Sequence, residues 1–293
     1  MSPVKKQSSP RLKAPKTKID KKKVEKAVKK AAVKPVSQKP KVFVFQPEIR
    51  IYPSSHLLFE ETAPMVMMAA REAADVRGRF ILALSGGTTP KGLFQQLTEE
   101  PYLHLMPWSK TFVFWVDERH VPPDHPDSNY RMAQECLLSK VPIPKANLFP
   151  ATNGSMPVDR AAVVYEGKIK KFFGPSADLP RFDLTLLGMG KDGHTASLFP
   201  GVQPLNEQKK WVVGYFVDEE RKERVSLTFP LLNASRLLLV LLEGEKKAER
   251  ARDVLEGPSD PPRYPIHYLR PVDGRLIFAM DAAAASSLKQ NPS

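Results

Sequence analysis

The sequence predicts an α/β domain with a mostly parallel central sheet, helices on both faces, and a disordered basic tail in front of it. From residue 42 onward, short apolar runs alternate with longer segments whose apolar residues recur every three or four positions. Ahead of that pattern, residues 1–41 hold 15 Lys and Arg residues against two acids, and no aromatic residue. The first observation predicts the sheet and its helices, and the second predicts the tail.

The tail carries all of the excess positive charge of the chain. The 293 residues have a net charge of +13, and residues 1–41 alone account for it, so residues 42–293 are neutral overall. A segment so charged and so poor in apolar residues cannot bury enough surface to offset the entropy lost on ordering. We therefore divide the chain into a disordered Lys-, Pro- and Ala-rich tail, 1–41, and a single domain, 42–293.

Composition excludes two classes of protein. The single cysteine, Cys136, cannot form a disulfide framework within the chain, and it suits a reducing compartment. The longest aliphatic block, at 237–242, is far too short to cross a bilayer, so we expect no membrane partner. Because no apolar stretch follows the basic start, we expect a cytoplasmic protein, and the tail leaves an organellar or nuclear fraction open.

Four nearly continuous apolar runs predict buried strands, since parallel strands covered on both faces show no polar alternation. They are 80–84, 111–116, 182–187 and 237–242. Their apolar character places all four inside the sheet and away from its edges. The resulting fold is Rossmann-like, and ligands of such sheets bind outside the carboxyl ends of the strands.

Helices are predicted where apolar residues recur at helical spacing. The five segments are 56–76, 91–97, 129–138, 159–173 and 246–255. Between the regular elements, proline-rich stretches at 122–126, 142–150 and 258–265 predict loops. Each of these loops is short enough to lie within one domain.

Polar loops follow all four predicted strands, at the edge where ligands bind. After the first strand, SGGTTP at 85–90 is a run of small residues whose backbone N–H groups can face an anion ahead of a helix. A plain tight turn would use the same glycines. From the residues alone, a phosphate cradle and a plain turn are equally good interpretations.

The other three strand ends carry ionisable residues. DERH at 117–120 leaves an otherwise apolar strand, which is unfavourable unless the charges face a cleft or pair with each other. GMGKDGHTAS at 188–197 places Asp192 two residues before His194, where a carboxylate can orient a general base. GEKKA at 244–248 begins a helix with two lysines, which the helix dipole disfavours unless an anion lies nearby.

These strings resemble the 6-phosphogluconolactonases, relatives of the glucosamine-6-phosphate deaminases. The matching strings are SGGTTP at 85–90, VDERHVPPDHPDSNYRMA at 116–133, GMGKDGHTASLFPG at 188–201, RVSLTFPLLNASR at 224–236 and GEKKA at 244–248. Their order and spacing match over nearly all of 45–285. After His194 the chain reads TASLFP, where the deaminase branch carries an acid, and this favours the lactonase branch.

The resemblance implies hydrolysis of 6-phosphoglucono-1,5-lactone to 6-phosphogluconate, the second step of the oxidative pentose phosphate pathway, with no cofactor and no metal. It implies His194 as general base on water, with Asp192 or Asp117 orienting its ring. It implies a substrate and phosphate site made of Gly86, Gly87, Thr88, Thr89, Arg119, Arg224 and Lys247, in which the backbone of 86–88 holds the phosphate and Arg224 and Lys247 are its cationic partners. The expected partner is a small sugar-phosphate lactone, and the expected state is a monomer.

Two rival functions fit the same residues. A sugar-phosphate isomerase or deaminase would keep the fold and use Asp117 and His194 to move protons, but it would need the acid that is missing after His194. A binding module would use the tail on a polyanion. A lysine-rich tail without aromatics supports only weak, salt-dependent contact and carries no base readout.

Overall fold

The computed structural model of the protein describes residues 46–174 and 179–289, which belong to one structural unit. The predicted tail, 1–41, lies outside the described residues. The centre of the unit is a seven-stranded sheet in the order β1-β10-β9-β6-β2-β3-β5, with every neighbouring pair parallel. The predicted α/β fold with a parallel sheet is therefore confirmed.

The strands of this sheet are β1 (Glu48–Tyr52), β2 (Phe80–Leu84), β3 (Thr111–Trp115), β5 (Leu148–Phe149), β6 (Leu184–Leu187), β9 (Leu237–Leu242) and β10 (Arg275–Asp281). A second, antiparallel sheet has the order β4-β8-β7 and consists of β4 (Asp117–Arg119), β7 (Val212–Phe216) and β8 (Glu223–Leu227). All four strands predicted from apolar runs lie inside the large sheet, as expected. The prediction of a loop over 142–150 is wrong at its end, where β5 is too short to leave a sequence pattern.

The α-helices are α2 (Ser55–Arg77), α3 (Thr89–Leu97), α4 (Tyr102–Leu105), α5 (Asn129–Ala133), α6 (Val158–Phe173), α7 (Phe229–Asn233), α8 (Ala248–Leu255) and α9 (Ala282–Ala285). Shorter turns are η1 (Trp108–Lys110), η2 (Gln134–Leu138, a π-helical turn), η3 (Lys145–Asn147), η4 (Gln203–Asn206), η5 (Glu245–Lys247) and η6 (Pro265–Tyr268). All five predicted helices are present.

Two of the predicted helices and one predicted loop need correction in detail. The segment 129–138 is not one α-helix, because it continues from α5 into η2. The segment 246–255 begins in the 3-10 turn η5, so its two lysines precede the α-helix. The loop predicted over 258–265 ends one residue early, because Pro265 already begins η6.

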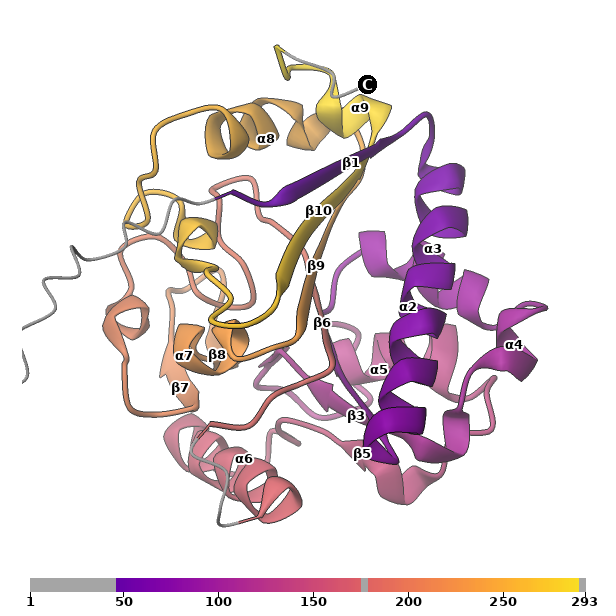
Figure 1. Cartoon of the computed structure of the whole chain (residues 1–293). Coiled ribbons are helices and arrows are strands. Elements are labelled where there is room, and N and C mark those ends of the chain that lie inside the picture. The colour runs from indigo at the N-terminus through magenta and orange to yellow at the C-terminus, as the bar shows by residue number, and fades with distance from the viewer. Residues whose placement is uncertain (1–45, 175–178, 290–293) are drawn as a thin grey trace, which may run out of the picture. The chain divides into compact units, whose positions relative to one another are not determined.

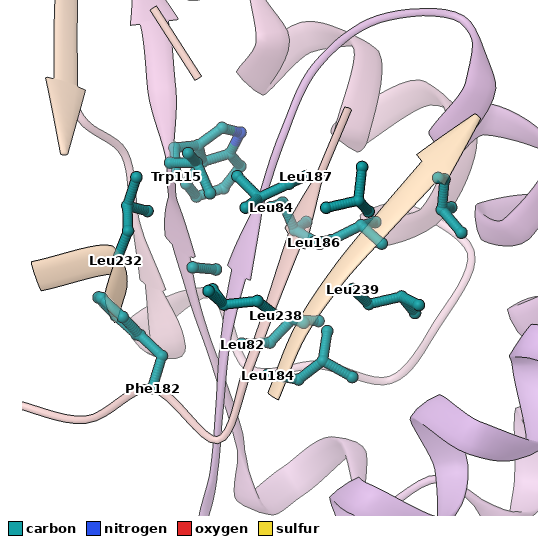
Figure 2. Packing of buried hydrophobic residues seen from close by; sticks show 14 of the residues in the cluster. Leu82, Leu84, Trp115, Phe182, Leu184, Leu186, Leu187, Leu232, Leu238 and Leu239 are labelled. Carbon is teal, nitrogen blue, oxygen red and sulfur yellow. The ribbon is translucent and has the colours of Figure 1, made fainter. Parts of the chain in front are cut away.

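The hydrophobic core lies on both faces of the large sheet. Figure 1 shows α2 and α3 on one side of the sheet and α6 and α7 on the other. In Figure 2, leucines from neighbouring strands, among them Leu82, Leu184 and Leu238, pack side by side, and all three are at most 2% exposed. Full burial of one such side chain contributes about 1.5–3 kcal/mol, so this core fixes the order of the strands.

Tyr165 on α6 closes the sheet where its edge strand ends. β5 pairs with β3 only at Val113 and Phe114, so Trp115 lacks a strand partner on that side. The Tyr165 hydroxyl donates to Trp115 O and accepts from Trp115 N, both at 2.8 Å. Tyr165 is fully buried, so a side chain supplies the hydrogen bonds that a longer strand would have supplied.

No helix in the described part of the chain is long and apolar enough to cross a membrane.

The exchange Tyr165→Phe should lower the free energy of unfolding by about 1–3 kcal/mol, because it leaves a buried backbone N–H and C=O unpaired. Urea denaturation followed by circular dichroism would measure the loss. The matched control is Tyr102→Phe, since the Tyr102 hydroxyl makes no hydrogen bond that the described residues show and is only partly buried. Equal stabilities of the two variants would contradict this account of the sheet edge.

Candidate active site

The loops that follow β2, β3, β6 and β9 line one pocket at the carboxyl edge of the sheet. Its lining residues are Ser85, Gly86, Gly87, Thr88, Thr89, Pro90, Asp117, Arg119, Asn129, Gly188, Met189, Gly190, His194, Ala196, Leu241 and Lys247. An adjoining pocket shares Asp117, Arg119, His194 and Ala196, and adds Asp192, Ser197, Phe199, Arg221 and Arg224. The predicted convergence of the four loops is therefore confirmed, although the predicted site residues divide between two adjoining pockets.

The imidazole of His194 is held by the neighbouring carboxylate of Asp192. His194 Nδ1 lies 2.5 Å from Asp192 Oδ1, and the backbone N–H of His194 donates to the same oxygen at 3.2 Å. Burial alone would raise the pKa of Asp192, but hydrogen bonding to His194 and the charge of that ring outweigh it and lower the pKa to about 2. With Nδ1 engaged, Nε2 is the ring nitrogen left to accept a proton from a ligand or water.

The turn before His194 requires glycine at position 190. Gly190 N donates to His194 O at 2.8 Å, which folds the chain back on itself. A Cβ atom at this position would lie 2.1 Å from His194 Nδ1. On its other side the imidazole packs against Phe199, with ring centroids 4.3 Å apart. The ring is therefore packed against both Gly190 and Phe199, and His194 lines both pockets.

Asp117 has a different partner. It is 8% exposed, and its Oδ2 accepts a hydrogen bond from Ser197 Oγ at 2.6 Å. The backbone oxygen of Ser197 in turn accepts from Tyr215 Oη at 2.5 Å. Of the two carboxylates that were candidates to orient His194, Asp192 contacts the ring, and Asp117 is bonded to Ser197.

The loop after β2 presents backbone donors to the pocket. Among the described residues, no hydrogen bond is made by the amides of Gly86, Gly87 or Thr88. The next helix, α3, begins directly after Thr88, whose side chain does not cap it. Unpaired N–H groups at a helix start suit an anion.

Three cations were expected to bind substrate, and they occupy different places. Lys247 lines the same pocket as the β2 loop and donates to Met189 O at 2.6 Å. Arg119 lines both pockets, and its Nη1 donates to Asp127 O at 2.6 Å. Arg224 lines only the adjoining pocket of the two. Lys247 therefore lines the same pocket as the Gly-rich loop, whereas Arg224 lines the adjoining pocket.

Partial burial makes Lys247 and Arg224 favourable partners for an anion. It lowers the pKa of Lys247, with a further contribution from the charge of Lys191. It likewise lowers the pKa of Arg224, where the neighbouring charge of Arg119 adds to the effect. An anionic ligand would offset the cost of keeping these two side chains charged. In the described ranges, no group of three His, Cys, Asp or Glu side chains is placed to hold a metal ion.

Sequence reasoning missed Asn129 and Ser197 as parts of the site. Asn129 lines the main pocket, and Ser197 bonds to Asp117. Both lie inside strings that carried the family resemblance, so the signal was present. Their residue types do not suggest a role, because Ser and Asn are common in any surface loop.

The family model described as "Glucosamine-6-phosphate isomerases/6-phosphogluconolactonase" matches residues 53–278. This chain belongs to that family. The matched range includes all four pocket-forming loops. The resemblance found in the sequence is therefore confirmed.

Relatives within the family match most of the chain. A protein of Oryza sativa subsp. indica named "Probable 6-phosphogluconolactonase 3, chloroplastic" is 40% identical, over 81% of this chain and 75% of its own length. A 6-phosphogluconolactonase of Synechocystis is 36% identical, over 83% and 99%. The solved structure of 6-phosphogluconolactonase from Trypanosoma cruzi is 31% identical, with a TM-score of 0.73 over 84% of this chain and 98% of that one.

A second buried carboxylate, Glu118, organises the loop beside the site of this family member. It is 2% exposed, and its oxygens accept four hydrogen bonds. The donors are Arg119 N at 2.8 Å, Asn129 N at 2.7 Å, Tyr130 N at 2.8 Å and Ser128 Oγ at 3.1 Å. Burial nevertheless raises the pKa of Glu118 to about 7, against the lowering effect of the backbone donors.

The raised pKa of Glu118 predicts a specific dependence of stability on pH. The folded state holds the proton more tightly than the unfolded state, so this stabilising contribution is complete below pH 4.5 and is lost as pH rises through 7. Between pH 5 and pH 8, the unfolding free energy of the wild type should therefore fall by up to about 3 kcal/mol more than that of the Glu118→Gln variant. Urea titrations at several pH values would measure it, and parallel curves for the two proteins would contradict it.

Proposed function

We propose that this protein hydrolyses 6-phosphoglucono-1,5-lactone to 6-phosphogluconate. The observation that carries the proposal is the pocket itself, where an imidazole bonded to a carboxylate faces a loop of unpaired backbone amides and a lysine. Hydrolysis of a lactone that carries a phosphate requires a site for the anion and a base that activates water, and this pocket offers both. Relatives over more than four fifths of the chain are named 6-phosphogluconolactonases.

In the proposed mechanism, His194 acts as general base through Nε2. It takes a proton from a water molecule while the water oxygen bonds to the lactone carbonyl carbon. As the bond from that carbon to the ring oxygen breaks, His194 returns the proton to the leaving oxygen. The contact with Asp192 keeps the proton on Nδ1 and stabilises the charged ring. Because a lactone is an activated ester, one base with good positioning is sufficient.

The 6-phosphate is proposed to bind the amides of Gly86, Gly87 and Thr88, with Lys247 as the adjacent cation. Arg224 and Arg119, at the adjoining pocket, would contact the far end of a ligand that spans both pockets. Thr89, which lines the same pocket at the start of α3, is proposed to contribute through its position in the loop. Half-buried cations and backbone amides without a partner among the described residues favour a doubly charged phosphate over neutral groups.

The lining of the pockets disfavours the isomerase or deaminase alternative. Proton transfer between C1 and C2 of an amino sugar would use a further acid after His194. At that point the chain carries Ser197 and Phe199, which contact Asp117 and the His194 ring. We assign Asp117 an electrostatic and structural role, since its hydrogen bond to Ser197 ties the loop after β6 to β4.

We keep the cytoplasm as the predicted location and the monomer as the predicted state. The chloroplastic name of the rice relative makes an organelle the main alternative location.

The function is tested with freshly generated lactone. The purified full-length chain should accelerate loss of 6-phosphoglucono-1,5-lactone above its spontaneous hydrolysis, and it should release no ammonia from glucosamine 6-phosphate. Ammonia release would move the protein to the deaminase branch. A lack of activity on both substrates would refute the proposal.

Replacement of the proposed base should abolish turnover and spare binding. For His194→Ala we expect kcat to fall by about 100-fold or more, the usual contribution of a general base, with little change in the affinity for 6-phosphogluconate. Stopped assays with lactone and calorimetry with product would separate the two effects. His125→Ala, an exchange of a histidine outside both pockets, is the control and should keep full activity.

Replacement of the proposed phosphate cation should act on phosphorylated ligands alone. Lys247→Met should raise KM for the phosphorylated lactone by about 10-fold or more, since a charge-assisted hydrogen bond contributes about 1.5–3 kcal/mol. The rate with unphosphorylated gluconolactone should stay the same. The control is Lys246→Met, at the exposed residue next to Lys247, and it should leave both rates unchanged. An equal loss with both lactones would show a folding defect and would count against the assignment.

A further inference from the structure

Asn129 joins the Gly-rich loop to the strand that carries Asp117. Its side chain lines the main pocket and is almost fully buried, and its Nδ2 donates to Asp117 O at 2.9 Å. On the other side it lies directly against Gly86, where a Cβ atom would be 1.7 Å from Asn129 Oδ1. Any residue except glycine at position 86 would displace this amide. Asn129 is therefore held between two parts of the site.

The donor bond fixes which way the amide of Asn129 faces. Because Nδ2 is committed to a carbonyl oxygen, the other atom must be the acceptor Oδ1. Oδ1 accepts no hydrogen bond from the described residues, and it is not among their fully enclosed polar atoms that lack a partner. The oxygen is therefore not fully enclosed, and the pocket that Asn129 lines is the place where a ligand can reach it. A ligand group that binds there has to be a hydrogen-bond donor.

Glu118 holds Asn129 in this position. Its carboxylate accepts the backbone N–H of Asn129 at 2.7 Å, and it also accepts from Ser128 Oγ and Tyr130 N, on either side. Three consecutive residues at the start of α5 are thus fixed to one buried group. Glu118 itself is not part of the pocket lining, so it can act on a ligand only through these residues.

We propose that Asn129 Oδ1 accepts a hydrogen bond from a ring hydroxyl of the substrate, and that Glu118 is the positioning residue that keeps it in place. The inference rests on the proposed function and adds to it a determinant of specificity. A dianionic phosphate has no hydrogen to donate, so this oxygen selects for the hydroxyl-bearing part of the ligand. Lactones that lack that hydroxyl leave the acceptor unpaired and are rejected.

The test compares Asn129→Ala with the wild type on the normal substrate and on three analogues that lack the hydroxyl at C2, C3 or C4. On the normal substrate, kcat/KM should fall about 10- to 100-fold, which corresponds to loss of one buried hydrogen bond. On one of the analogues, wild type and variant should agree within about threefold, because the bond is already missing. Asn153→Ala, an exposed asparagine elsewhere, should match the wild type throughout.

A thermodynamic cycle tests the role of Glu118. Glu118→Gln should lower kcat/KM, and the double variant Glu118→Gln/Asn129→Ala should be no worse than Asn129→Ala alone, within about threefold. Losses that multiply would show that Glu118 does not act through Asn129. Thermal unfolding of every variant would identify any that fail to fold, and the cycle then uses Asn129→Asp in place of the alanine exchange.

The outcomes separate this inference from the function on which it rests. If the wild type fails to hydrolyse the lactone, both are overturned. If the wild type is active and Asn129→Ala is equally active, or loses the same factor on all three analogues, only the role of Asn129 is overturned.

Discussion

Four apolar strands run in the same direction through the middle of the large sheet, and every functional position follows from that alignment. β2, β3, β6 and β9 are buried on both faces and carry no charged side chain; their polar side chains are Thr111 and Thr185, both fully buried. Charged groups are therefore confined to the strand ends, and parallel pairing brings all four carboxyl ends to one edge. The hydrophobic core that orders the strands thus also gathers the four loops at one edge.

Neighbouring side chains of β4 point in opposite directions and have different roles. Asp117 and Arg119 line the pocket, and the residue between them does not. Side chains of successive strand residues point to opposite sides, so Glu118 is turned toward the start of α5. One short strand thus supplies groups that face a ligand and a buried carboxyl group that fixes the loop behind them. That carboxyl group accepts four hydrogen bonds, three of them from backbone N–H groups.

The sequence was sufficient for the parts of the fold that depend on hydrophobic pattern. The four central strands, the five predicted helical segments and the convergence of polar loops all follow from the spacing of apolar residues. Details that depend on tertiary contacts were not predictable. Asp192 lies two residues before His194 and is its partner, whereas the partner of Asp117, Ser197, lies 80 residues away and has no local signature. Ala196, in the left-handed region at a φ of 52°, has no sequence signature, and β5 is too short to show one.

The way Tyr165 completes the hydrogen bonding of β3 also bears on how this protein avoids aggregation. A sheet edge with unpaired backbone groups is a template on which a second chain can add a strand. Here one edge strand, β5, is only two residues long, and a buried phenol occupies the backbone positions just beyond it. At the other edge, β1 carries the charged side chains Glu48 and Arg50. Each edge of the sheet in the described chain thus offers little flat, apolar backbone, which disfavours intermolecular strand addition and growth of fibrils.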